Sequence, residues 1–286
     1  MFAVLALLSA ACYGAADFLG GLTAKRASTV AIVVVSQLSG LLLLLIMFPL
    51  LPAALPVRGD FLWGALAGLT GGAGVALLYR ALAIGVMAIV APTTAVCAVA
   101  IPVLVAVGLG ERPSVLAVGG IGLAIFAIGL ISQSSHPDPT PREDSQNAVD
   151  SHMSAFSLAL VSGVLVGLFF LALARTSDQA GLWPLVAARI VSVSLFAGMA
   201  LVASQSLSLP TGIVGTVVAG GVLDMLANLL YMIATRSGPL SVVVTLASLY
   251  PASTVLLARV ILHERLNARQ WIGIACALVA VVAIVR

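Results

Sequence analysis

The sequence predicts an all-α membrane protein with ten transmembrane helices, arranged as two inverted repeats of five helices each. Composition is the first reason: 62% of the 286 residues are hydrophobic and only 8% are charged, whereas soluble domains carry about 25% charged residues. The second reason is that charges and Pro/Gly clusters divide the chain into ten apolar segments. The third is a single polar linker with five of these segments on each side.

Each apolar segment is close to the roughly 20 residues that a helix needs to cross a bilayer. The segments are 2–22, 29–51, 61–83, 86–109, 114–132, 154–174, 182–203, 211–235, 239–262 and 269–285. The first segment is not preceded by a basic region and is long enough to span the bilayer. We therefore interpret it as an uncleaved first helix rather than a signal peptide.

The polar linker covers residues 133–153 and contains three prolines and four of the chain's ten acidic residues. Such a composition is typical of a flexible, solvated connection. The linker divides the chain into a first five-helix repeat, 1–132, and a second, 154–286. Because each repeat has an odd number of spans, the second must be inverted in the membrane relative to the first.

A shift of 152 to 153 residues brings similar residues of the two halves together. The superimposed pairs are Gly68 with Gly220, Tyr79 with Tyr231, Glu111-Arg112 with Glu264-Arg265, and Gly120 with Gly273. The Glu-Arg pairs fall in the same short loop of each half, and we interpret them as ion pairs and helix caps. Tyr79-Arg80, at the end of the third span, is interpreted as an anchor at the membrane interface.

The ten spans, the five-plus-five repeat and the two Glu-Arg pairs together resemble the drug/metabolite transporter superfamily, and within it the EamA-type inner-membrane exporters. The resemblance covers nearly the whole chain except the linker. It implies a secondary transporter in a bacterial-type inner membrane. It also implies a central cavity lined by the first, third, fourth, sixth, eighth and ninth spans.

A second resemblance is local to the first span. Asp17, with Gly20 and Lys25 after it, is similar to the first helix of the small multidrug resistance transporters, where a glutamate binds protons and drugs. This resemblance implies the same role for Asp17 and cytoplasmic positions for both termini. Counting arginines and lysines in the loops does not decide the orientation.

The halves also differ at positions that matter for a site. Many family members carry an arginine in the second span of each half; Arg189 fits this position in the seventh span, but the second span has Gln37. Asp17 maps near Gly167, so the second half has no matching acid. We therefore expect an asymmetric site between the repeats.

Asp17 is the only charged side chain between Met1 and Thr23. A charge inside a membrane span is energetically unfavourable and usually marks a transport pathway. One interpretation is that Asp17 faces a central cavity as proton acceptor or cation partner, with Tyr13 hydrogen-bonded to it. The alternative is a structural ion pair with Arg189 or Lys25.

The eighth span carries a similar polar stripe, since Asp224, Asn228 and Tyr231 share one helix face at i, i+4 and i+7. This stripe could oppose the stripe of the first span, or Asp224 could lie near the helix start and bond to backbone or solvent. Arg189 either extends to the interface or faces inward to bind a carboxylate.

The remaining candidates complete the predicted site. Gln37 and Tyr250 are added to the cavity lining, and three prolines that interrupt helical hydrogen bonds are candidate hinges. These prolines are Pro92, Pro102 and Pro251.

Other function classes lack the residues that they require. The sequence has no catalytic constellation, nucleotide-binding loop or metal-ligand spacing, which indicates that the protein is not an enzyme and uses no cofactor or metal. The net charge of +3 is spread out, which argues against a nucleic-acid partner. The expected partners are a small-molecule substrate, protons and the lipid bilayer, with a monomer favoured.

Two inward acids against one inward arginine favour a cationic or zwitterionic substrate, such as an amino acid or an amphipathic cation. The sequence thus predicts a proton-coupled exporter that works by alternating access. The alternatives are an uncoupled facilitator or exchanger and, in a different class, a membrane-embedded sensor or scaffold.

Overall fold

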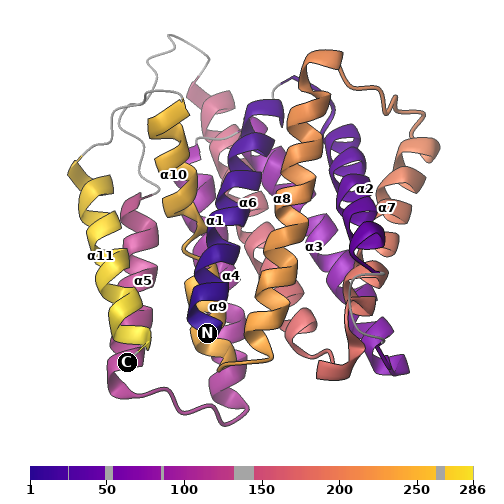
Figure 1. Cartoon of the computed structure of the whole chain (residues 1–286). Helices are drawn as coiled ribbons and strands as arrows, with labels where there is room; N and C mark the ends of the chain where they lie inside the picture. Colours follow the sequence, from indigo (N-terminus) through magenta and orange to yellow (C-terminus); the bar gives the residue numbers. More distant parts are fainter. Residues whose placement is uncertain (25, 49–53, 85–86, 132–144, 262–267, 286) are drawn as a thin grey trace.

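The computed structural model describes residues 1–24, 26–48, 54–84, 87–131, 145–261 and 268–285 (Figure 1). The helices of the first half are α1 (Phe2–Ala24), α2 (Thr29–Met47), α3 (Arg58–Ile84), α4 (Met87–Gly108) and α5 (Val115–Ile131). Those of the second half are α6 (Ser145–Ala174), the short 3-10 helix η2 (Asp178–Ala180), α7 (Trp183–Val202), α8 (Thr211–Thr235), α9 (Leu240–Ala247), α10 (Tyr250–Ile261) and α11 (Ala268–Val285). All regular structure in these ranges is helical, which confirms the all-α prediction.

The apolar helices fit an arrangement of ten membrane spans. Within the described residues, seven segments reach spanning length, and α4, α5 and α11 contribute shorter apolar stretches. Large apolar side chains such as Leu42, Leu104 and Val282 remain exposed on the outside of the bundle. Lipid tails solvate such a surface, whereas water does not.

The ninth span is split, although the sequence predicts one segment over 239–262. The helix ends at Ala247 and restarts at Tyr250, so that α9 and α10 follow one another in one span. Pro251 is the second residue of α10. Proline lacks a backbone N–H but loses nothing in the first turn of a helix, where that N–H has no intrahelical acceptor.

The packing of the helices has the symmetry of two exchanged repeats. Helix α1 of the first half packs on α8 of the second, and its counterpart α6 packs on α3. Two helices meet their own counterparts, α2 against α7 and α5 against α11. The five-helix units are therefore interleaved, and the interior of the protein is the surface between them (Figure 1).

Two buried hydrogen bonds give the register of this symmetry. The Ser9 hydroxyl donates to the carbonyl of Ala227 at 2.8 Å, and the Ser162 hydroxyl donates to the carbonyl of Gly74 at 2.7 Å. Donors and acceptors are both 153 positions apart, so one bond is the repeat of the other. In this register Asp17 corresponds to Phe170, which corrects the sequence-based match to Gly167.

A pair of glycines allows the repeats to approach closely. A β-carbon at Gly68 would overlap the carbonyl oxygen of Ala188 on α7, and one at Gly221 would overlap the carbonyl oxygen of Ser36 on α2. The two contacts are again repeats of each other, which pairs Gly68 with Gly221 rather than with Gly220. Small residues at such positions let the backbones of membrane helices come into contact.

Replacing Gly221 by valine is expected to destabilise the folded protein by about 3 kcal/mol, because α8 must move away from α2 to make room. Gly215→Val on the same helix is the matched control, since a β-carbon there meets nothing. Unfolding of the purified variants in detergent measures the difference. Equal stability of the two variants would contradict close packing at Gly221.

Both termini lie at the end of the bundle where α4 ends and α9 begins (Figure 1). Glu111 bridges the two repeats at this end. Helix α4 closes with backbone bonds from Gly110 to Val107 and from Glu111 to Ala106, and Gly110 has a left-handed φ of 100°. This turn is a Schellman motif. The Glu111 carboxylate then accepts the N–H groups of Leu240 at 2.6 Å and Ser241 at 3.1 Å, at the start of α9.

Glu111 thus caps a helix of the opposite repeat, which confirms the helix-cap prediction for this residue. A carboxylate at a helix N-terminus is also favoured by the helix dipole. Glu264 and Arg265, the matching pair of the second half, lie outside the described residues.

A second polar cluster ties the repeats together at the same end. The Asp60 carboxylate accepts the N–H of Val57 and both the N–H and the hydroxyl of Ser177, at 2.7 to 2.9 Å. Arg236, which follows α8, donates to the carbonyls of Ser177 and Gly181. Together with Glu111, these contacts close the terminal end of the interface between the repeats.

Candidate functional site

A cavity lies between the two repeats and collects most of the predicted site residues. Its volume is about 70 Å³, room for a few water molecules. All six predicted spans contribute to its lining, and α2 and α7 contribute as well, through Gln37 and Arg189. The predicted residues in the lining are Tyr13, Asp17, Gln37, Arg189, Asp224, Asn228 and Tyr250.

Arg189 faces the interior, where each of its three guanidinium nitrogens has a side-chain partner, so it does not extend to the interface. It forms an ion pair with Asp224 at 2.5 Å, donates to the side-chain carbonyl of Gln37, and lies 3.3 Å from the sulfur of Met225. Only 6% of its surface is exposed. A buried arginine needs such a partner, because an uncompensated charge in this environment is strongly unfavourable.

Gln37 and Arg189 are repeat-related positions that contact each other. They occupy equivalent places on α2 and α7, the helices that meet across the symmetry of the fold. Two arginines at these positions would repel each other at this distance. Glutamine at one of these positions makes a hydrogen bond instead, and its side-chain oxygen also accepts the hydroxyl of Ser192 at 3.1 Å.

Tyr13 does not bond to Asp17, contrary to the sequence-based interpretation. Its hydroxyl instead donates to the side-chain oxygen of Asn228 at 2.6 Å. The amide of Asn228 in turn donates to the backbone carbonyl of Asp224 at 2.7 Å and to its carboxylate at 3.2 Å. Helical spacing places Tyr13 and Asp17 on the same face of α1. The hydroxyl of Tyr13, however, bonds to Asn228 of α8 on the other side of the interface between the repeats.

The polar stripes of α1 and α8 therefore face each other, as the sequence allowed. Asp224 lies in the middle of α8 rather than near its start. A continuous chain of contacts runs from Tyr13 through Asn228 and Asp224 to Arg189.

Asp17 lies outside this chain of contacts. It lines the cavity, yet its carboxylate has no hydrogen-bond or ion-pair partner among the described residues. Arg189, one of the two alternative partners, is bound to Asp224, and Lys25 lies outside the described residues. With Asp224 neutralised by Arg189, the described residues that line the cavity carry one net negative charge when ionised, and that charge belongs to Asp17.

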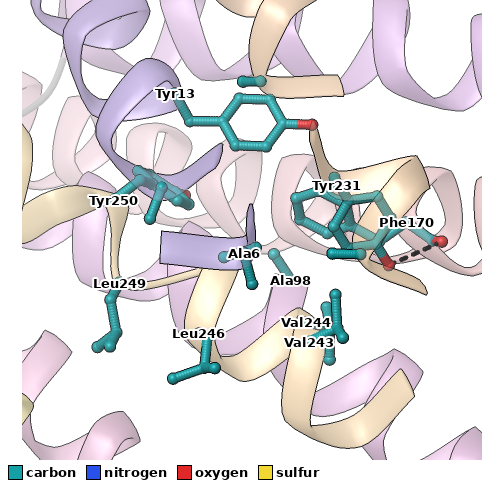
Figure 2. Close-up of a cluster of buried hydrophobic side chains, with 14 of the residues drawn as sticks. Ala6, Tyr13, Ala98, Phe170, Tyr231, Val243, Val244, Leu246, Leu249 and Tyr250 are labelled. Carbon is teal, nitrogen blue, oxygen red and sulfur yellow. Dashed lines mark hydrogen bonds between the residues drawn. The ribbon is translucent and has the colours of Figure 1, made fainter. Parts of the chain in front are cut away.

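Aromatic rings form one wall of the cavity. Tyr13 makes edge contacts with Phe170 at a centroid distance of 5.8 Å and with Tyr250 at 6.4 Å. Figure 2 shows these rings near the break between α9 and α10. Phe169 and Phe170 belong to the lining but are missing from the sequence-based site, where their adjacent positions in the sixth span were the available signal.

Tyr231 lies behind this wall and is not among the residues that line the cavity. It is fully buried, and its hydroxyl donates to the backbone carbonyl of Phe170 at 3.1 Å, drawn as a dashed line in Figure 2. The sequence-based placement of Tyr231 in the cavity is thereby corrected. Its position fixes the backbone that carries the Phe170 ring.

The candidate hinges lie in different settings. Helix α4 continues without interruption through Pro92 and Pro102, and Pro102 is buried. The surroundings of the Pro92 side chain lie outside the described residues. Pro251 directly follows the only break inside a span in the described part of the chain, one residue after Tyr250 of the cavity lining.

The described residues hold no group of three or more His, Cys, Asp or Glu side chains that could bind a metal ion. The cavity instead offers one unpaired carboxylate, a neutralised ion pair, amide and hydroxyl groups, and aromatic faces. Such a set can bind a small polar or charged molecule reversibly.

Ten apolar spans, two interleaved repeats and a polar cavity between them define a membrane protein with the architecture of a secondary transporter. The family model of the EamA-like transporter family matches residues 1–133 and again residues 153–286. The chain therefore belongs to the EamA-like transporter family, within the drug/metabolite transporter superfamily.

Comparison with solved structures supports the fold alone. One crystal structure, titled only as that of a protein, aligns with 97% of this chain and 98% of its own at 15% identity, with a TM-score of 0.68. The search of curated proteins gives no significant match.

Proposed function

We propose that the protein is a proton-coupled secondary transporter that exports a small cationic or zwitterionic metabolite by alternating access. It would work as a monomer in a bacterial-type inner membrane, with both termini in the cytoplasm. Membership of the EamA-like transporter family supports the transporter role. The coupling and the substrate class are inferred from the cavity.

The unpaired carboxylate of Asp17 is the observation that carries this proposal. Asp224 and Arg189 neutralise each other, so one proton or one monovalent cation is enough to neutralise the cavity. Because both ligands satisfy the same single charge, they compete for Asp17. Competition for one site exchanges protons for substrate across a membrane when the site changes its facing only while one of them is bound.

The engagement of Arg189 favours a cation over an anion. A substrate carboxylate would have to compete with Asp224 and Gln37, which already bind the guanidinium. Cations are also attracted to the faces of aromatic rings, and Tyr13, Phe169, Phe170 and Tyr250 supply such rings beside Asp17. An amphipathic monocation therefore fits best, with an amino acid as the zwitterionic alternative.

The contacts at the terminal end support a conformational cycle around this cavity. Glu111 and Asp60 each join one repeat to the other at that end. Access from the terminal side requires these contacts to open. The break between α9 and α10 lies next to Tyr250 and gives the cavity wall a place to bend.

Transport assays with charge-matched probes test the proposal. Three small aromatic probes of fixed or zwitterionic charge are suitable: benzyltrimethylammonium, phenylalanine and benzenesulfonate. In proteoliposomes with a pH gradient, the cation is expected to accumulate against its own gradient, by about tenfold per pH unit for one-for-one exchange. Phenylalanine is expected to follow weakly.

Two results would count against the proposal. Cation flux that is equal with and without the pH gradient would indicate an uncoupled facilitator. Transport of benzenesulfonate in preference to the cation would contradict the role of Asp17 as the free charge.

A further inference from the structure

The cavity has two halves that the symmetry of the fold relates to each other. The register of 153 positions, in which Tyr79 matches Met232 rather than Tyr231, relates α1 to α6 and α3 to α8. Four pairs of equivalent residues line the cavity with both of their members: Tyr13 with Val166, Asp17 with Phe170, Asp224 with Gly71, and Asn228 with Val75. One half therefore belongs to α1 and α8, and the other belongs to α3 and α6.

The two halves differ in chemistry at every one of these positions. In the first half, Tyr13 donates a hydrogen bond to Asn228, whereas valines occupy both equivalent positions of the second half. The carboxylates of Asp17 and Asp224 are matched by a phenyl ring and by a glycine. We call the α1/α8 residues of the four pairs the polar half and the α3/α6 residues, together with Phe169, the apolar half.

The polar groups nearest to the apolar half are already engaged. The hydroxyl of Thr94 on α4, which packs on α6, donates to the backbone carbonyl of Ala159 at 3.2 Å. The hydroxyl of Ser192, next to the α3 glycines, donates to Gln37 at 3.1 Å. A ligand in the apolar half therefore meets mainly hydrocarbon and aromatic surface.

Gly71 lies directly beneath an aromatic ring of this surface. A β-carbon at Gly71 would lie 2.7 Å from a ring carbon of Phe169, which is closer than van der Waals contact. The Phe169 ring lies 5.3 Å from the ring of Phe170, and that ring lies 5.8 Å from the ring of Tyr13. A row of aromatic rings thus leads from the apolar half to the polar half.

We propose that the apolar half is the subsite for the hydrocarbon group of the transported cation, and that Gly71 limits the size of this group. The charged end of the substrate binds at Asp17, and its ring or alkyl group lies against Phe169 and Phe170. This inference rests on the proposed function and deepens it, because it explains why the substrate is amphipathic. Removing such a group from water is favourable roughly in proportion to its apolar area.

Two probes of equal charge test the subsite. Benzyltrimethylammonium and tetramethylammonium share the same cationic head group, and the first has a phenyl ring in addition. The purified wild-type protein is expected to bind benzyltrimethylammonium at least about tenfold more tightly. Isothermal titration calorimetry in detergent measures both dissociation constants, with the heat of titration into protein-free micelles subtracted.

Gly71→Ala is expected to remove most of this difference while changing the affinity for tetramethylammonium by less than about twofold. The added methyl group and the displaced Phe169 ring both take space from the apolar half. Gly122→Ala on α5, where a β-carbon meets nothing, is the matched control and should leave both affinities unchanged.

Val75→Thr is a second variant that keeps the volume of the side chain and adds a hydroxyl to the apolar half. It is expected to weaken binding of benzyltrimethylammonium by about threefold and to leave tetramethylammonium unchanged. Its control is Val164→Thr, on an α6 side chain that is 40% exposed on the outside of the bundle. Thermal unfolding of each variant verifies that the fold is retained, and Val75→Thr decides the test if Gly71→Ala does not fold.

An unchanged ratio of the two dissociation constants in Gly71→Ala and Val75→Thr overturns the inference, as does an equal loss of affinity for both cations. Asp17→Asn provides the contrast, because it is expected to weaken both cations alike. If Asp17→Asn left both affinities unchanged, the proposed function would fail. Failure of the subsite alone would appear as a normal effect of Asp17→Asn with no change of the ratio in the α3 variants.

Discussion

Replacing Asp224 by alanine is expected to destabilise the protein by about 3–5 kcal/mol, the range found when one partner of a buried ion pair is removed. Arg189 is 6% exposed and would retain its charge without the carboxylate that now lies 2.5 Å away. Gln37 contributes only a neutral dipole. The loss is measured by equilibrium unfolding in mixed detergent micelles.

Two controls separate this effect from simple truncation. The double variant Arg189→Met/Asp224→Ala removes both charges and is expected to be more stable than Asp224→Ala alone. Asp178→Ala removes an acid that lies 4.0 Å from Arg236 and is 79% exposed, and should change stability by less than about 1 kcal/mol. If Asp224→Ala reduced the free energy of unfolding no more than Asp178→Ala does, the ion pair would not stabilise the protein.

Replacing Asp17 by asparagine is expected to abolish the response of transport to a pH gradient while leaving the fold intact. Asparagine has nearly the same shape but cannot bind a proton or carry a negative charge. Since the Asp17 carboxylate has no partner in the described part of the chain, its neutralisation breaks no contact there. Stability should be unchanged or increased, in contrast to Asp224→Ala.

Binding of benzyltrimethylammonium to Asp17→Asn is expected to weaken by about tenfold or more, because a cation loses its only unpaired counter-charge in the cavity. Asp178→Asn is the matched control on the protein surface. Cation binding at wild-type strength in Asp17→Asn would show that the substrate site does not include this carboxylate.

The architecture could be predicted from sequence because its signals are long and local. Ten apolar segments of spanning length and one proline-rich linker define the repeats without knowledge of any contact. The break between α9 and α10 escaped prediction because Ser248 and Leu249 form a short turn inside an uninterrupted apolar run. Pro251 was the only residue in this segment that the sequence analysis marked as a possible hinge.

The composition of the cavity was also predictable, since polar residues in apolar spans are few. Their pairing was not. Helical periodicity places Tyr13 and Asp17 on one face, but the helix opposite determines that Tyr13 bonds to Asn228. Likewise, Arg189 could be expected to bind an acid, while the choice of Asp224 depends on how α7 packs beside α8.

The register between the repeats explains the remaining differences. A match of Asp17 to Gly167 instead of Phe170 is an error of three residues, close to one helical turn, which preserves the helix face and is invisible in sequence. The equivalent hydrogen bonds of Ser9 and Ser162 resolve it.

Proton movement during substrate exchange tests the role of Asp17 most directly. Proteoliposomes containing a pH-sensitive dye report protons that leave or enter as benzyltrimethylammonium is added on one side. The wild-type protein is predicted to move protons opposite to the cation, and Asp17→Asn is predicted to move none. Equal proton movement in both proteins would contradict the assignment of coupling to Asp17.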